Sequence, residues 1–148
     1  MDPREQRVFL KKILRDHADS IALCEILFGA SQVWDDLVDE PQKATKGDVN
    51  ETMLMLLSDL PSNSFYREHI VYLQPIVEMA IVDWLTANSL ELHGSDEALH
   101  LSFVLRDSLT YIVLACARIL FGVRYAIAVG AEVRTFFHDE TFNEYVGR

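Results

Sequence analysis

Apolar residues recur at helical spacing along most of the chain, and no segment shows the two-residue alternation of a half-buried strand. The pattern therefore predicts an all-α fold, which we expect to be a single-domain bundle of about five helices over residues 1–148. The main helices are expected over residues 3–14, 20–40, 53–60, 65–92 and 99–129. A capping box at Asp48 should precede the third, and Pro75 should kink or divide the fourth.

The helix that ends near Glu40 is expected to be central, because residues 21–33 are apolar on most sides. Its last turns contain Asp35, Asp36 and Asp39 beside Glu40, and Pro41 disfavours any continuation. A helix C-terminus carries partial negative charge, and like charges four residues apart repel, so these acids are unfavourably placed. A nearby metal ion would compensate them, as would arginines from elsewhere in the chain. A third interpretation is a solvated acidic helix end.

At about 100° per residue, the three aspartates share one arc of this helix with Gln32 and, three turns earlier, Glu25. We call this arc the acidic seam. Gly29 lies near it, where a missing side chain would admit a ligand or a neighbouring backbone.

A second polar stripe follows in the last third of the chain. Its members, separated by 7, 4, 7 and 7 residues, are His100, Asp107, Tyr111, Arg118 and Tyr125. If one continuous helix carries them towards the acidic seam, His100 and Arg118 meet the carboxylates, while Arg106 and Arg124 share another face. The alternative is the exposed edge of an amphipathic helix.

Glu78 and Asp83 interrupt a strongly apolar run between residues 76 and 84. Hard cations such as Mg²⁺ take carboxylate oxygens, so these acids are candidates to complete a metal site opposite the aspartates. Pairing with Arg106 or Arg124 is the alternative.

Composition narrows the function classes. The net charge of −10 argues against binding to a nucleic-acid backbone. Cys24 and Cys116 lie in apolar helical runs and indicate core thiols in a reducing compartment. The longest apolar run, residues 109–117, is too short to cross a bilayer. We expect a soluble, cytoplasmic protein that binds no membrane and that associates with itself or with another protein.

Asp35-Asp36-Leu-Val-Asp39 resembles the DDxxD motif of class I isoprenoid synthases, an all-α family. The resemblance covers six residues, including Glu40. It implies that Asp35, Asp36 and Asp39 bind Mg²⁺, that the metal holds a substrate diphosphate, and that a basic residue such as Arg118 meets the diphosphate.

A looser resemblance joins residues 34–39, 60–66 and 84–91 to short helical proteins encoded by tailed bacteriophages. It implies a virion or host-takeover role. Two hypotheses therefore stand: Mg²⁺-assisted binding or turnover of a diphosphate-containing small molecule, and a non-catalytic helical interaction protein whose acidic seam is paired internally or faces a partner. The residues do not decide whether the protein is an enzyme.

Overall fold

The computed structural model describes residues 1–147, and every regular element in that range is helical. The all-α prediction is confirmed. Seven of the helices in this range have nine residues or more, and several short helical segments join them. The chain divides into two compact units, Asp2–Ile70 and a second unit that runs from Val71 onward.

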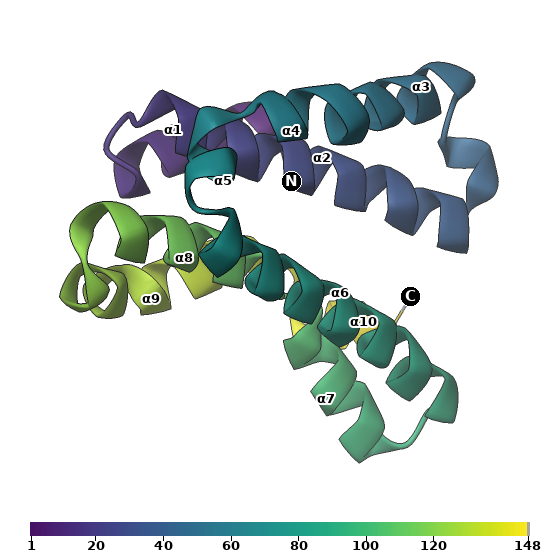
Figure 1. Ribbon diagram of the computed structural model, residues 1–148. Coiled ribbons are helices and arrows are strands. Elements are labelled where there is room, and N and C mark those ends of the chain that lie inside the picture. Colours follow the sequence, from purple (N-terminus) through teal and green to yellow (C-terminus); the bar gives the residue numbers. More distant parts are fainter. Residues whose placement is uncertain (148) are drawn as a thin grey trace. The chain divides into compact units, whose positions relative to one another are not determined.

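The first unit contains two long helical stretches linked by a short turn. Its elements are α1 (Pro3–Ile13), α2 (Ala18–Asp39), the 3₁₀ turn η1 (Pro41–Lys43), α3 (Lys46–Leu54), the π-helical turn η2 (Met55–Asp59), α4 (Leu60–Ser62) and α5 (Ser64–Glu68). The run from α3 to α4 returns alongside α2 (Figure 1). The first half of α2 is buried almost all round, as expected for a central helix, whereas its acidic end is largely exposed.

Local sequence explains where the first helices begin and end. Asp2 caps α1 by accepting a hydrogen bond from the backbone N–H of Arg4 at 2.9 Å, and Pro3 follows at the first helical position. Arg15 and Asp16 both adopt positive φ angles, which separate α1 from α2. Pro41 ends α2 as expected, since α2 stops at Asp39.

The next helix begins earlier than the sequence predicted. Thr45 is the N-cap residue and forms a reciprocal capping box with Asp48, so α3 starts at Lys46. Asp48, which was expected to begin a capping box, is instead its last residue. Gly29 of α2 faces this segment. A side-chain atom at Gly29 would lie 3.4 Å from the Cε of Met55, so the neighbour that the glycine admits is a methionine side chain.

The second unit consists of α6 (Ile70–His93), α7 (Asp96–Leu105), α8 (Thr110–Phe121), α9 (Val123–Phe137) and α10 (Phe142–Val146). Helices α8 and α9 lie side by side as a hairpin (Figure 1), whose turn is Gly122 with a φ of 92°. Gly94, with a φ of 70°, directly follows the last residue of α6.

Two helix boundaries differ from expectation. Pro75 sits inside α6 without dividing it, and the break falls at His69 instead. The proline removes the hydrogen bond to the carbonyl of Val71, whose side chain is 89% exposed, so water can reach this turn. The expected long helix over 99–129 is interrupted at residues 106–109 and at Gly122, so the second polar stripe is spread over three helices, and Gly130 lies inside α9.

Helix α6 is apolar but contributes little to the core. Over its most apolar 18-residue window the mean hydropathy is 1.3, yet only 17% of the window is buried. By length and composition alone, α6 is also the one helix among the described residues that could cross a membrane. The exposed apolar residues of α6 therefore need an explanation.

Asn63 is expected to stabilise the first unit through two hydrogen bonds, one buried and one partly buried. Its side chain caps α5 by accepting from the N–H of Tyr66 at 2.8 Å and donates to the carbonyl of Asp19 in α2 at 2.9 Å. Asn63→Ala should lower the free energy of unfolding by about 2 kcal/mol in urea titrations. Asn50→Ala, at an exposed position in α3, should change it by less than about 0.5 kcal/mol. Equal effects would show that Asn63 does not join α5 to α2.

Candidate functional site

The three aspartates of the acidic seam lie at the exposed end of α2. Asp36 accepts a hydrogen bond from the side chain of Gln32, one turn earlier, at 3.2 Å. Asp35 is half-buried, and Asp39 is exposed and makes no hydrogen bond or ion pair through its side chain within residues 1–147. The helix end therefore holds one carboxylate, that of Asp39, which is open to solvent or to a partner in the described part of the chain.

A lysine, which the sequence pattern did not indicate, lies beside this helix end. The ammonium of Lys43 in η1 lies 3.0 Å from a carboxylate oxygen of Glu40. The hydrogen bond and charge of Glu40, followed by the charges of Asp36 and Asp35, raise the pKa of Lys43 above its usual range. Pro41 turns the chain directly after α2 and places Lys43 back over the negative end of the helix dipole.

Farther back along the seam, Glu25 is paired with an arginine. The Nε and one terminal nitrogen of Arg7 in α1 donate to the two carboxylate oxygens of Glu25 at 3.0 and 3.1 Å. This bidentate geometry is the strong form of such a pair. Arg7 of α1, which the four-residue connection to α2 brings alongside, thus neutralises Glu25, about three turns before the three aspartates.

An open groove of about 420 Å³ begins beside this pair, between α1 and α2 on one side and η2 and α4 on the other. Its lining includes Arg7, Glu25, Ile26, Met55 and Asp59. Its size falls in the range of small-molecule sites, and π-helical turns occur often at functional positions. However, two of its charged groups already neutralise each other, so the groove defines no ligand by charge.

Metal binding by the acidic seam stays a prediction. Within residues 1–147, no three histidine, cysteine or acidic side chains converge as a metal site needs. Asp35, Asp36 and Asp39 belong to the first unit, whereas Glu78 and Asp83 belong to the second. Glu78 is exposed, and neither it nor half-buried Asp83 makes a side-chain hydrogen bond or ion pair within the described range.

Two of the basic candidates of the second unit, Arg118 and His100, have local partners. The guanidinium of Arg118 lies over the ring of Tyr72, 4.8 Å from its centroid. The His100 ring stacks on Phe142 with centroids 4.0 Å apart. Arg124 is exposed at the start of α9.

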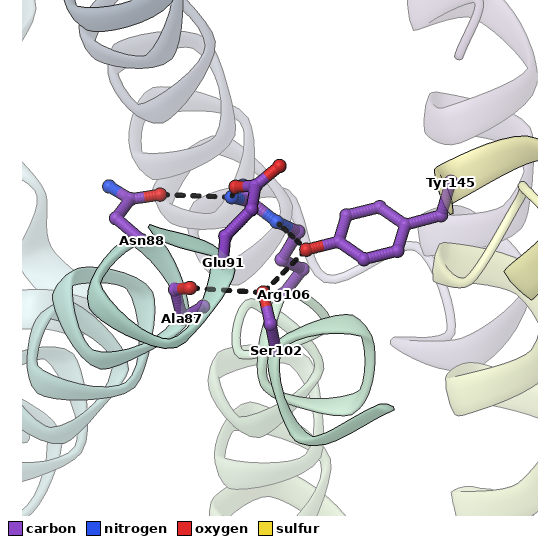
Figure 2. A network of polar contacts seen from close by, with 6 residues as sticks. All are labelled: Ala87, Asn88, Glu91, Ser102, Arg106 and Tyr145. Carbon is purple, nitrogen blue, oxygen red and sulfur yellow. Dashed lines mark hydrogen bonds and ion pairs between the residues drawn. The ribbon is translucent and has the colours of Figure 1, made fainter. Parts of the chain in front are cut away.

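Arg106 is the best-satisfied of these cations. As Figure 2 shows, its guanidinium donates to Asn88 at 3.0 Å, to the hydroxyl of Tyr145 at 3.3 Å and to the carboxylate of Glu91. Ser102 donates to the carbonyl of Ala87 at 3.0 Å and bonds the Tyr145 hydroxyl at 2.5 Å. Because Ser102 is fully buried and Tyr145 nearly so, the network joins α10 to α6 and α7 rather than facing a substrate.

A further pair was missed from the sequence, because the second polar stripe, which includes Asp107, was expected either to meet the acidic seam or to form an exposed helix edge. Asp107 is buried, and it accepts from Arg134 of α9 at 2.9 Å and from the hydroxyl of Thr110. Burial raises the pKa of Asp107, although Thr110, Arg134 and His138 act in the opposite direction. The one feature of the sequence that could have indicated the burial of Asp107 is its position just before the apolar segment that forms α8.

Comparison with known protein families, with curated proteins and with solved structures finds no match to this chain.

Asp39 tests whether the acidic helix end is uncompensated. Asp39→Asn should raise the free energy of unfolding by a few tenths of a kcal/mol at low salt, because it removes a charge from the negative end of α2. The matched change Asp96→Asn removes an acid from the first turn of α7, where the dipole favours it, and should lower stability by a similar amount. If both variants change the free energy of unfolding in the same direction, this electrostatic account is wrong.

The metal hypothesis can be checked with the same helix end. If Asp35, Asp36 and Asp39 bind Mg²⁺, adding the ion raises the melting temperature of the parent protein through mass action, and Asp35→Asn/Asp39→Asn loses that response. Equal shifts of the melting temperature in parent and variant would show that Asp35 and Asp39 do not bind the metal.

Tyr145→Phe should lower the free energy of unfolding by about 1–2 kcal/mol, because it removes the hydroxyl that bonds buried Ser102 and Arg106. Tyr111→Phe is the control, since the Tyr111 ring is exposed and lies under Arg134, and its hydroxyl makes no hydrogen bond within residues 1–147. Chemical denaturation of both variants measures the difference. If Tyr145→Phe leaves the free energy of unfolding unchanged, the network does not hold α10 in place.

Proposed function

We propose that this protein is a non-catalytic helical interaction protein, and that it binds a protein partner through the exposed apolar side of α6. The observation that carries the proposal is the low burial of this long apolar helix. Its large exposed residues include Val71, Met79, Val82, Leu85 and Leu92, and Leu92 is 90% exposed.

Isolated apolar residues on a surface are ordinary, but a contiguous exposed patch along one helix is typical of an interaction site. Burying a Val, Leu or Met side chain contributes about 1.5–3 kcal/mol when the burial is complete. Because Val82 and Leu85 are about half exposed, a partner that covers them would gain a substantial part of this energy.

The polar chemistry supports binding over catalysis. Arg7 and Glu25 pair with each other, Asp107 pairs with Arg134, and the Ser102–Tyr145 contact is buried. These groups are satisfied within the fold. The remaining acids at the end of α2, with the net charge of −10, favour a basic partner and would affect its association rate more than its affinity.

The resemblance to short helical bacteriophage proteins agrees with such a role, because a virion or host-takeover component acts by binding other proteins. This setting is part of the proposal. The alternative of Mg²⁺-assisted diphosphate chemistry rests on the DDxxD resemblance of Asp35, Asp36 and Asp39.

Leu85→Gln tests the proposal. If α6 serves binding rather than folding, the change should leave the free energy of unfolding within about 0.5 kcal/mol of the parent value. It should also weaken the binding of an apolar fluorescent dye such as anilinonaphthalene sulfonate to the folded protein, because the dye reports exposed apolar surface.

Leu57→Gln is the matched control, since Leu57 is an exposed leucine of η2 outside α6. Dye binding that falls with Leu57→Gln and not with Leu85→Gln would place the apolar site on the first unit. A loss of several kcal/mol with Leu85→Gln would show that α6 is covered within the folded chain, and would contradict the proposal.

A further inference from the structure

The exposed side of α6 has positions at the spacing of a coiled-coil seam, and four of the seven hold valine or leucine. Seven residues, separated alternately by four and three positions, are all exposed: Val71, Pro75, Glu78, Val82, Leu85, Ser89 and Leu92. We call this set the α6 stripe. A mean spacing of 3.5 residues keeps one line of side chains facing a partner helix along its whole length. The partner that fits this geometry is another α-helix.

Glu78 lies near the middle of the apolar side. At 100° per residue it is within about 40° of Val71, Val82 and Leu85. It makes no side-chain hydrogen bond or ion pair within the described residues. A helix that covers the stripe removes water from this carboxylate, and an unpaired buried carboxylate is strongly unfavourable. The partner must therefore place a cation opposite Glu78.

A second copy of the chain fits poorly. Residues 70–93 contain no lysine or arginine, so the α6 of another copy has no such cation to offer Glu78. A parallel pair of stripes would bring two Glu78 carboxylates together, and an antiparallel pair centred on Val82 would set each against Leu85. The net charge of −10 adds further repulsion between copies.

A bilayer fits less well than a helix. Glu78 and Asp83 would lie within the hydrocarbon, where ionised carboxylates are costly. The chain's negative charge also opposes approach to an anionic lipid surface.

We infer that the α6 stripe binds an amphipathic, basic helix of another protein in coiled-coil packing, with a lysine or arginine of that helix paired to Glu78. This inference rests on the proposed function, which requires only that α6 binds a partner. The charge of Glu78 then selects among apolar helices, because a helix without a cation at that position leaves the carboxylate desolvated and unpaired.

Three synthetic helical peptides of 24 residues test the charge rule. Each has leucine at the other seam positions and glutamine or alanine elsewhere. They differ only at the third and fifth of seven seam positions, which face Glu78 in a parallel and in an antiparallel pairing, and which are both arginine, both glutamate or both leucine. Isothermal titration with the full chain should show that the arginine peptide binds at least tenfold more tightly than the glutamate peptide.

Glu78→Arg should reverse this preference, and Glu78→Gln should abolish it. The control Glu51→Arg changes the net charge equally at an exposed position in α3, and should leave the preference as it is in the parent. The inference is overturned if Glu78→Arg and Glu51→Arg change the peptide preference equally. It is also overturned if neither variant changes the preference.

The inference and the proposed function fail in different ways. If Leu85→Gln weakens the binding of all three peptides while Glu78→Arg leaves the preference among them unchanged, α6 binds partners but Glu78 does not select them. If no peptide binds and the protein instead forms a dimer in sedimentation, or floats with neutral or anionic phospholipid vesicles, the helix-partner assignment is wrong. If no peptide binds and Leu85→Gln destabilises the fold, both are wrong.

Discussion

A carboxylate in the middle of an exposed apolar stripe imposes two opposing demands on α6. The apolar side chains favour removal from water, and Glu78 disfavours it unless a cation accompanies the partner. In the free protein Glu78 stays hydrated, and the apolar side chains around it stay exposed to water. Together they favour a basic helix over a second copy or a bilayer, because each of those would leave Glu78 without a counter-charge.

Elsewhere in the molecule, several carboxylates are paired with arginine or lysine. Arg7 neutralises Glu25, and Arg134 neutralises the buried Asp107. At the exposed end of α2, Lys43 pairs with Glu40 while Asp39 remains open. The paired groups stabilise the two units, and the open acids contribute to the negative field that a basic partner would meet.

The sequence predicted what local chemistry determines. Asp2 and Pro3 at a helix start, Pro41 after a helix and Gly94 at a helix end act through their own backbone, so these boundaries could be predicted. The pairing of Arg7 with Glu25 depends on how α1 packs against α2, and no local pattern contains that register. The interruption at residues 106–109 has no proline or glycine to reveal it. The exposure of α6 was hidden for a related reason, since a buried helix and an interface helix can have the same apolar composition.

Cysteine labelling of the α6 stripe tests most directly whether that stripe is open to water in the free protein. The native Cys24 and Cys116 are fully buried, so Val82→Cys provides a single accessible thiol. With a maleimide reagent, we expect Val82→Cys to react in the folded protein nearly as fast as in urea, and at least tenfold more slowly once the arginine peptide saturates the stripe. Slow labelling of the free folded protein would show that α6 is already covered, and would contradict the account.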